Sequence, residues 1–276
     1  MKNSRRDFLK TSLTASALTA LPAGLSAADT KAGAGRDYYE LRAYRLKPGA
    51  SKARLDAYLE RALLPALEQR GIRTVGAFTE LEVDKVAGTS KPLVDSPVWV
   101  FIPHPSLESF VSVSADLNAD PAVQKAGQAY LAVGKDDPVY TRIDSWLLRA
   151  FAGMPHLEQP GFSKQRIKTR ILEMRSYESF SEAKALAKMA MFNDGEMDVM
   201  RKIGMSPIFF GQAIAGRDLP HLTYATSAPD LATHLANWKK FSTHPDWVKI
   251  KDLPQYADTV SKNTPHFLVP TSYSQI

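Results

Sequence analysis

The chain contains the stretch Tyr39-Glu-Leu-Arg-Ala-Tyr44 and, 133 residues later, the similar stretch Leu172-Glu-Met-Arg-Ser-Tyr177. Glu, Arg and Tyr recur in the same order and spacing, and both stretches alternate in a way that is typical of a strand. The same offset relates Gly71 to Gly204. Self-similarity at a fixed distance indicates an internal repeat. The sequence therefore predicts two copies of one structural unit.

Later pairs confirm the order of the repeat but at a shorter offset of 124 residues: Pro105-Ser-Leu107 matches Pro229-Asp-Leu231, and Asp120-Pro121 matches His244-Pro245. The offset falls because the first copy has the longer connection, and loops absorb such insertions most easily. We expect that connection, with its polar stretch Gly88–Pro92, to be a loop between two strands. The predicted repeats are residues 37–151 and 167–274, joined by a linker of Pro and Gly character at 152–166.

Each repeat shows strand, helix, two strands, helix and strand in turn. In the first copy the predicted strands are 38–46, 72–81, 98–102 and 140–149. Leucines at helical spacing from Leu55 to Leu67 predict the first helix, with a kink at Pro65 and an end at Gly71. A second helix follows from Leu107, and a shorter one begins after Asp120-Pro121. In the second copy, Asn193-Asp-Gly195 interrupts the first helix.

This β-α-β-β-α-β order is the ferredoxin-like unit, whose helices cover one face of the sheet and leave the other bare. Two such repeats in one chain can cover their bare faces by packing sheet to sheet. The predicted fold is of the α+β class, an intrachain dimeric α/β barrel.

The segment Ser4-Arg-Arg-Asp-Phe-Leu-Lys10 precedes a short, weakly apolar run and small residues near Ala28. It resembles a twin-arginine (Tat) signal peptide over residues 1–28. The resemblance implies export in the folded state, with the Tat translocase as partner, cleavage near Ala28 and a periplasmic location. The run is too short to span a bilayer, and we expect no stable membrane anchor.

The chain has no cysteine, which excludes disulfides, thiolate nucleophiles and cysteine-ligated metal clusters. Its net charge is +6, and half of that charge lies in the signal segment. Because no basic stripe with interleaved aromatic residues follows, we do not expect nucleic acid as a partner.

Two stretches of the second repeat carry a family resemblance: MFNDGEMDVMRKIGMSPIFFGQAIAGRDLPHLTY (Met191–Tyr224) and WKKFSTHPDWVK (Trp238–Lys249). They resemble the NIPSNAP family, and the first repeat resembles a more diverged copy. The family is similar to dimeric α/β-barrel proteins, which include small oxygenases and haem-handling enzymes. The resemblance implies a fold but no agreed catalytic residues.

The repeated trios supply the candidate ligand site. Since strand side chains alternate between faces, we expect Leu41 and Ala43 to meet the helices and the trios to line the barrel interior. The predicted site comprises Glu40, Arg42, Tyr44, Glu173, Arg175, Tyr177 and His221. These residues would hold an acidic or phenolic ligand; the alternative is a structural Glu–Arg ion pair.

The six histidines, at 104, 156, 221, 234, 244 and 266, include no pair at metal-ligand spacing. We predict no metal and no cofactor. His221 and His266 begin strands and could reach the central space, although a surface position explains either. His244 precedes Pro245, where it is expected to cap a helix.

Two further groups of side chains are explained by core packing or by exposure to solvent. Trp238, Phe241 and Trp247 are spaced for a helical core. Glu196 could do acid–base work if it were buried beside Asp198, but we expect both to be exposed.

The favoured function is an exported small-molecule-binding or interaction module of unassigned chemistry. The alternative is a cofactor-poor oxygenase or isomerase acting on a small organic substrate inside the barrel, and a weaker one is a haem-binding protein. The sequence leaves open whether two chains associate into a homo-oligomer.

Overall fold

The computed structural model describes residues 35–49 and 52–276. The signal segment and its expected cleavage point near Ala28 lie outside the described residues. The first half contains the elements β1 (Tyr38–Leu46), α1 (Lys52–Tyr58), the π-helical turn η2 (Leu59–Leu63), α2 (Leu64–Gln69), β2 (Gly76–Asp84), β3 (Thr89–Pro92), β4 (Val98–His104), α3 (Leu107–Ala119), α4 (Pro121–Ala126), α5 (Gln128–Leu131) and β5 (Tyr140–Ala150).

The second half repeats this order without a counterpart of β3. Its elements are α6 (Gly161–Lys164), β6 (Ile171–Glu178), α7 (Glu182–Met191), the π-helical turn η3 (Phe192–Glu196), α8 (Met197–Lys202), β7 (Ser206–Ala215), β8 (His221–Ala228), α9 (Leu231–Thr243), α10 (Pro245–Lys251), the 3-10 turn η4 (Pro254–Tyr256) and β9 (Lys262–Pro270).

Eight strands form a closed antiparallel barrel. Their order is β2-β4-β1-β5-β7-β8-β6-β9, and β9 pairs again with β2, while β3 extends the sheet beyond β2. Within each repeat the strand order is that of a ferredoxin-like sheet. The repeats meet at two seams, β5–β7 and β9–β2, where the last strand of one repeat pairs with the second strand of the other. The predicted intrachain barrel is confirmed.

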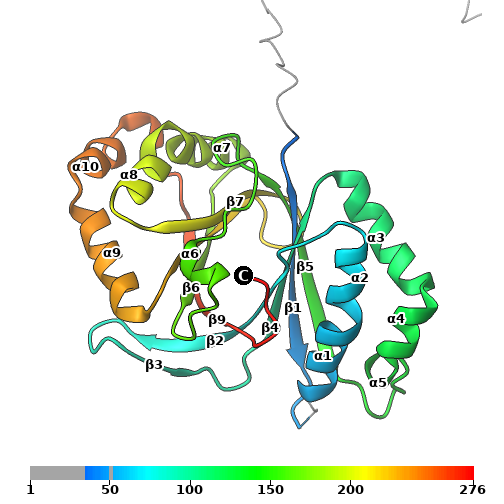
Figure 1. Ribbon diagram of the computed structural model, residues 1–276. Helices are drawn as coiled ribbons and strands as arrows, with labels where there is room; N and C mark the ends of the chain where they lie inside the picture. The colour runs from blue at the N-terminus through cyan, green and yellow to red at the C-terminus, as the bar shows by residue number, and fades with distance from the viewer. Residues whose placement is uncertain (1–34, 50–51) are drawn as a thin grey trace, which may run out of the picture. The chain divides into compact units, whose positions relative to one another are not determined.

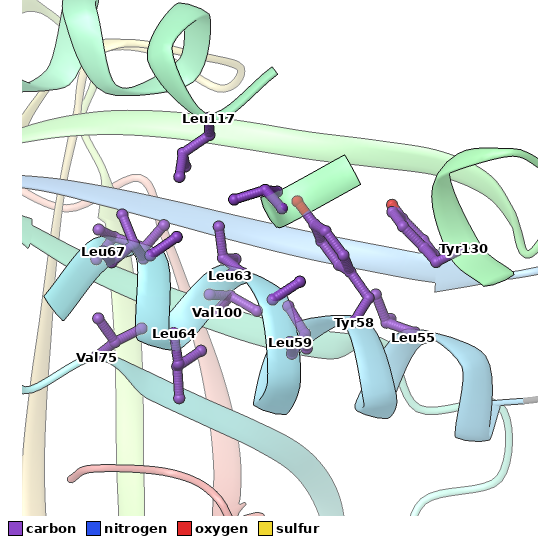
Figure 2. Close-up of a cluster of buried hydrophobic side chains, with 14 of the residues drawn as sticks. Leu55, Tyr58, Leu59, Leu63, Leu64, Leu67, Val75, Val100, Leu117 and Tyr130 are labelled. Carbon is purple, nitrogen blue, oxygen red and sulfur yellow. The ribbon is translucent and has the colours of Figure 1, made fainter. Parts of the chain in front are cut away.

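Helices cover the outer face of each sheet, with α1–α5 over the first repeat and α7–α10 over the second (Figure 1). In the first repeat, leucines of α1, η2 and α2 point toward the strands, and Tyr58 stacks on Tyr130 with ring centroids 4.4 Å apart (Figure 2). The leucines that recur at helical spacing in the sequence are thus the residues that this cluster buries. Burying one such side chain contributes about 1.5–3 kcal/mol.

Both first helices contain a π-helical turn at equivalent positions, η2 and η3, offset by 133 residues. In the first repeat the turn lies just before Pro65, whose ring removes one backbone donor. In the second repeat the turn contains Gly195, which has a φ of 156°. The kink predicted at Pro65 and the interruption predicted at 193–195 are thus both associated with a π-helical turn.

Two predictions about the first repeat are wrong. The second strand begins at Gly76, not at residue 72, because Ile72 and Val75 pack into the helical core and Thr74 between them has a left-handed φ of 64°. The polar stretch around Gly88 is not a plain loop. It turns at Gly88 and forms β3, which pairs with β2 and accounts for the longer connection.

No helix in the described part of the chain is long and apolar enough to cross a membrane.

Candidate functional site

The Glu-Arg-Tyr trios share one face of their strands, but it is the outer face, so their predicted placement in the barrel interior is wrong. Leu41, Ala43, Leu172 and Met174 line the interior instead. Tyr44 lies in the helical core of the first repeat and Tyr177 in that of the second. The physical reason is solvation. The barrel interior is narrow and apolar, whereas beneath the helices each Glu finds polar partners and each Arg keeps part of its side chain exposed to solvent.

In the second repeat the trio fastens α9 to the sheet. Arg175 Nη2 lies 2.8 Å from Glu173 Oε1, and its guanidinium stacks 3.8 Å from the centre of the Trp238 ring. His234 Nε2 lies 2.8 Å from Glu173 Oε2. Burial opposes ionisation of Glu173, which is fully buried, but His234 and Arg175 outweigh it and the pKa of this carboxyl falls below its ordinary value.

The first repeat repeats this arrangement with a different histidine. Arg42 donates two hydrogen bonds to Glu40, and His104 Nε2 lies 3.5 Å from Glu40 Oε2. His104 in turn contacts Ser109 of α3 through Nδ1. Burial again opposes ionisation, and the hydrogen bonds from His104 and Arg42 lower the pKa of Glu40 overall. Each trio therefore contains a Glu–Arg ion pair within its own strand, beneath the helices, as in the structural alternative.

A second buried pair was missed by the sequence analysis. Lys188 of α7 donates a 2.7 Å hydrogen bond to Glu196, and both residues are buried. The ammonium lies 4.6 Å from the centre of the Phe192 ring. Burial raises the pKa of Glu196. The expectation that Glu196 is exposed is wrong, because the π-helical turn rotates it inward, while Asp198 does lie at the surface.

The core prediction for three aromatic residues of the second repeat is confirmed. Phe241 lies between Trp238 and Trp247, with ring centroids 5.5 Å and 4.6 Å away. Nε1 of Trp238 also lies 3.0 Å from Nε2 of His234. The indole therefore joins the aromatic core to the ion pair beneath α9.

The middle of the barrel is filled by side chains. Phe101 of the first repeat stacks on Phe209 of the second with centroids 4.5 Å apart, and Ile276 packs beside Phe78. The space left among these residues is about 10 Å³, which is about what a single water molecule needs. No ligand of useful size fits there.

One mouth of the barrel, at the carboxyl ends of β1 and β6, opens into a cavity of about 400 Å³. Both repeats contribute, and Arg45 and Glu178 occupy equivalent positions in them. The cavity is lined by Leu41, Arg45, Glu80, Leu93, Asp95, Pro97, Trp99, Trp146, Ser176, Glu178, Arg217, Asp218, His221, Thr223, Lys262, Thr264 and His266. Its size and mixture of aromatic and polar groups suit a small organic molecule.

Glu80 is a polar group of this cavity that two neighbouring side chains hold in place. Trp99 donates a 2.6 Å hydrogen bond from Nε1 to Glu80 Oε1, and His266 Nδ1 lies 3.2 Å from Glu80 Oε2. Burial opposes ionisation of Glu80, but the hydrogen bonds from His266 and Trp99 outweigh it and its pKa is lowered. Since an ionised carboxylate only accepts hydrogen bonds, Nδ1 of His266 carries its proton toward Glu80.

His221, the remaining predicted site residue, lies in the lining of the same cavity. Its Nδ1 donates to the carbonyl of Asp218 at 3.1 Å. Burial lowers the pKa of His221, so the imidazole is neutral at pH 7 and presents Nε2 as an acceptor. His221 and His266 thus both line the cavity at the mouth, and neither reaches the filled middle of the barrel.

An aromatic wall and paired charges complete the cavity. Trp99 and Trp146 stack with centroids 5.8 Å apart and an interplanar angle of 25°. The buried Asp144 pairs with Arg45 at 2.7 Å and with Arg217 at 3.4 Å. Lys262 pairs with Glu178 at 2.8 Å. Because these cations already have carboxylate partners, the cavity is suited to a polar molecule of low net charge.

The other histidines lie away from this cavity. His244 accepts a hydrogen bond from the backbone of Asp246 at the start of α10, so the capping prediction is confirmed. His156 pairs with Asp37 at the surface. Within residues 35–49 and 52–276, no group of three or more His, Asp or Glu side chains is arranged to hold a metal ion.

Glu80 should make the stability of the protein depend on pH. Since its folded pKa is depressed, its contribution is present above the unfolded value of 4.5 and is lost as pH falls through the folded pKa. We expect Glu80→Gln to lower the free energy of unfolding by about 1–2 kcal/mol at pH 7, and by much less at pH 3. Urea unfolding at both pH values measures this. Glu82→Gln, an exposed carboxylate of the same strand, is the control; an equal loss at both pH values would contradict the assignment.

Comparisons with known proteins agree with this architecture. Residues 172–275 match the NIPSNAP family model, and residues 2–22 match the model of the TAT (twin-arginine translocation) pathway signal sequence. No curated protein matches the chain.

Among solved structures, a candidate monooxygenase from Fusobacterium nucleatum aligns with a TM-score of 0.54 at 6% identity, covering 86% of this chain and 93% of its own. A candidate monooxygenase from Lactobacillus acidophilus gives a TM-score of 0.48 at 11% identity, covering 85% and 94%. An uncharacterized NIPSNAP-like domain protein from Burkholderia xenovorans gives 0.35 at 18% identity, covering 39% and 90%. At such identities the likeness concerns the fold.

The fold and its seams define a dimeric α/β-barrel protein with both halves in one chain. The second half of the chain is a NIPSNAP domain, and the N-terminal segment is a Tat signal sequence. The chain thus carries a NIPSNAP domain at residues 172–275 and a Tat signal sequence that directs export to the periplasm.

Proposed function

We propose that this protein is a periplasmic small-molecule-binding protein and that its ligand occupies the cavity at the barrel mouth. The observation that supports this proposal is the cavity of about 400 Å³ beside a barrel interior that is otherwise filled. Binding sites are commonly concave, largely pre-formed and lined by aromatic side chains with a few convergent polar groups. Trp99, Trp146 and the Glu80–His266 pair meet that description.

The lining favours a flat and weakly charged ligand. The indoles of Trp99 and Trp146 offer apolar faces, and the rim cations are already paired with carboxylates. His221 and His266 each have one ring nitrogen fixed by the protein, which leaves the other to contact the ligand. For the two trios we infer a structural role, since they lie in the helix-covered layers of the two sheets and not in the cavity.

The proposal predicts a ligand that a single substitution can displace. Thr223 lines the cavity and occupies the position equivalent to Trp99, so Thr223→Trp places an indole in the space. Native mass spectrometry of protein exported by its own signal is expected to show excess mass from a retained small molecule. In Thr223→Trp the affinity for that molecule should fall by at least about tenfold, because filling the cavity costs more than about 1.4 kcal/mol of binding free energy. The fraction of protein that carries the excess mass should fall accordingly.

Ser90→Trp, on the exposed strand β3, is the matched control and should retain the ligand. Retention by both variants would place the ligand elsewhere. A retained haem would be visible by its Soret absorption, and a colourless preparation argues against that alternative. The native mass spectra also report whether two chains associate into a homo-oligomer, which stays a prediction.

We also infer that residues 37–151 and 167–274 are two copies of one NIPSNAP-like domain joined at 152–166. The family model covers the second copy alone. What supports the first copy is the shared offset of 133 residues in β1 and β6 and in the two π-helical turns.

The alternative of a cofactor-poor enzyme is favoured by one observation, the Glu80–His266 pair inside the cavity.

A further inference from the structure

The Glu80–His266 pair lies at the seam that closes the barrel. Glu80 belongs to β2 of the first repeat and His266 to β9 of the second, and these strands pair directly. Glu80 is fixed from one side by the Trp99 indole at 2.6 Å and meets His266 Nδ1 at 3.2 Å on the other. With Nδ1 directed at the carboxylate, Nε2 has no hydrogen-bond partner among the described residues, and the side chain stays 23% exposed at the cavity.

The other seam of the barrel serves as an internal comparison. At the position equivalent to Glu80 the second repeat has Ala213, and at the position equivalent to His266 the first repeat has Trp146. The equivalence is visible in the register, since Met174 pairs with His266 as Leu41 pairs with Trp146. Closing the barrel at β5–β7 therefore needs no ion pair. The Glu–His pair at β2–β9 is an addition to the fold, placed where the cavity is.

We infer that Glu80 and His266 form a proton-transfer dyad, in which His266 is the general base for a flat carbon acid bound at the barrel mouth and Glu80 positions it. This inference rests on the proposed binding function of the same cavity. A histidine with one nitrogen held by a carboxylate and the other free toward a ligand has the arrangement that general-base catalysis requires.

The step balances without a redox partner. Nε2 of His266 takes the proton from a carbon next to a carbonyl group, the C–H electron pair moves into the conjugated system as an enolate, and the imidazolium is stabilised by the Glu80 carboxylate. Return of the same proton to a different carbon of the enolate regenerates neutral His266 and yields an isomer. The substrate class is therefore a small, enolisable, conjugated carbonyl compound, and the reaction class is isomerisation.

A general probe tests the base without knowledge of the natural substrate. In 5-nitrobenzisoxazole a base removes the ring C–H proton, the electron pair forms the nitrile, and the N–O bond breaks to release a coloured phenolate. The probe is flat and small enough for the cavity. Its unreactive analogue 5-nitroindazole measures binding alone by isothermal titration calorimetry.

We expect the mature exported protein to bind the analogue and to catalyse the elimination. His266→Gln should lower kcat/KM by a factor of about 100 or more while analogue binding persists. Glu80→Gln should lower kcat while the Kd of the analogue stays unchanged, because the imidazolium formed in the step loses its adjacent carboxylate. His156→Gln is the matched control, since His156 also pairs with a carboxylate but at the surface.

The outcomes separate the two proposals. If the analogue binds but no elimination occurs, or if His266→Gln retains the rate, the dyad is overturned and the binding site stands. If the analogue does not bind and no elimination occurs, both the dyad and the proposed ligand site for flat molecules are overturned. A rate lost equally in His156→Gln would show that the reaction occurs outside the cavity, which also overturns the dyad.

Discussion

Replacing Arg175 by alanine is expected to lower the free energy of unfolding by about 3–5 kcal/mol. Glu173 is fully buried and lies 2.8 Å from the Arg175 guanidinium. Removing the cation leaves a carboxylate that folding has taken out of water, with His234 at 2.8 Å and the half-exposed Lys85 at 3.8 Å as its remaining partners. The variant also loses the stacking of the guanidinium on Trp238 at 3.8 Å. Urea unfolding followed by tryptophan fluorescence measures the loss.

Arg142→Ala is the matched control, since Arg142 is exposed on β5, and it should change stability by less than about 0.5 kcal/mol. The double variant Glu173→Leu/Arg175→Met should recover much of the loss, because it leaves no unpaired charge. If Arg175→Ala is no more destabilising than Arg142→Ala, the structural role of the trios is wrong, and a ligand role for Arg175 becomes the better explanation.

Replacing Lys188 by leucine is expected to cost about 3–5 kcal/mol at pH 8. Glu196 accepts a 2.7 Å hydrogen bond from Lys188 and is buried. Because burial raises its folded pKa, Glu196 destabilises the folded chain increasingly as pH rises from the unfolded value of 4.5 through the folded pKa. The deficit of Lys188→Leu should therefore be largest at pH 8 and should shrink toward pH 5.

The first repeat shows how to rescue this variant. Leu55 and Leu63 occupy the positions equivalent to Lys188 and Glu196, and both are buried in the helical core. Lys188→Leu/Glu196→Leu copies that arrangement, and we expect it to be at least as stable as the natural protein at pH 8. Guanidinium unfolding of the single and double variants at both pH values tests this. A double variant as unstable as the single one would mean that the pair itself holds the helix to the sheet.

The fold could be predicted from the sequence because the chain contains two copies of the same structural unit. The hexapeptides fixed the offset, and the boundaries of β1 agree with the structure residue for residue. The alternation of side chains along β1 could not decide which face of the strand points into the barrel. Leu41 and Ala43 suit either an apolar barrel interior or a helical core, and only the closure of the barrel selects the interior for them.

The candidate site was accessible only in part. His221 begins β8, whereas His266 lies in the middle of β9 and not at its start as expected. Both line the cavity at the barrel mouth, and the sequence analysis named both. Glu80 gave no signal, because its partner is 186 residues away and the two meet only where β2 closes on β9. Glu196 was missed because a π-helical turn, which helical periodicity does not anticipate, rotates it into the core.

The most direct test of the account is a crystal structure of the mature protein soaked with 5-nitroindazole. The account predicts difference density for the probe at the barrel mouth, within contact of Trp146 and His266, with the side chains of the barrel middle unmoved. Density beneath the helices of the second repeat, beside Arg175 and Tyr224, with an empty mouth, would contradict it and return the site to the Glu-Arg-Tyr trios.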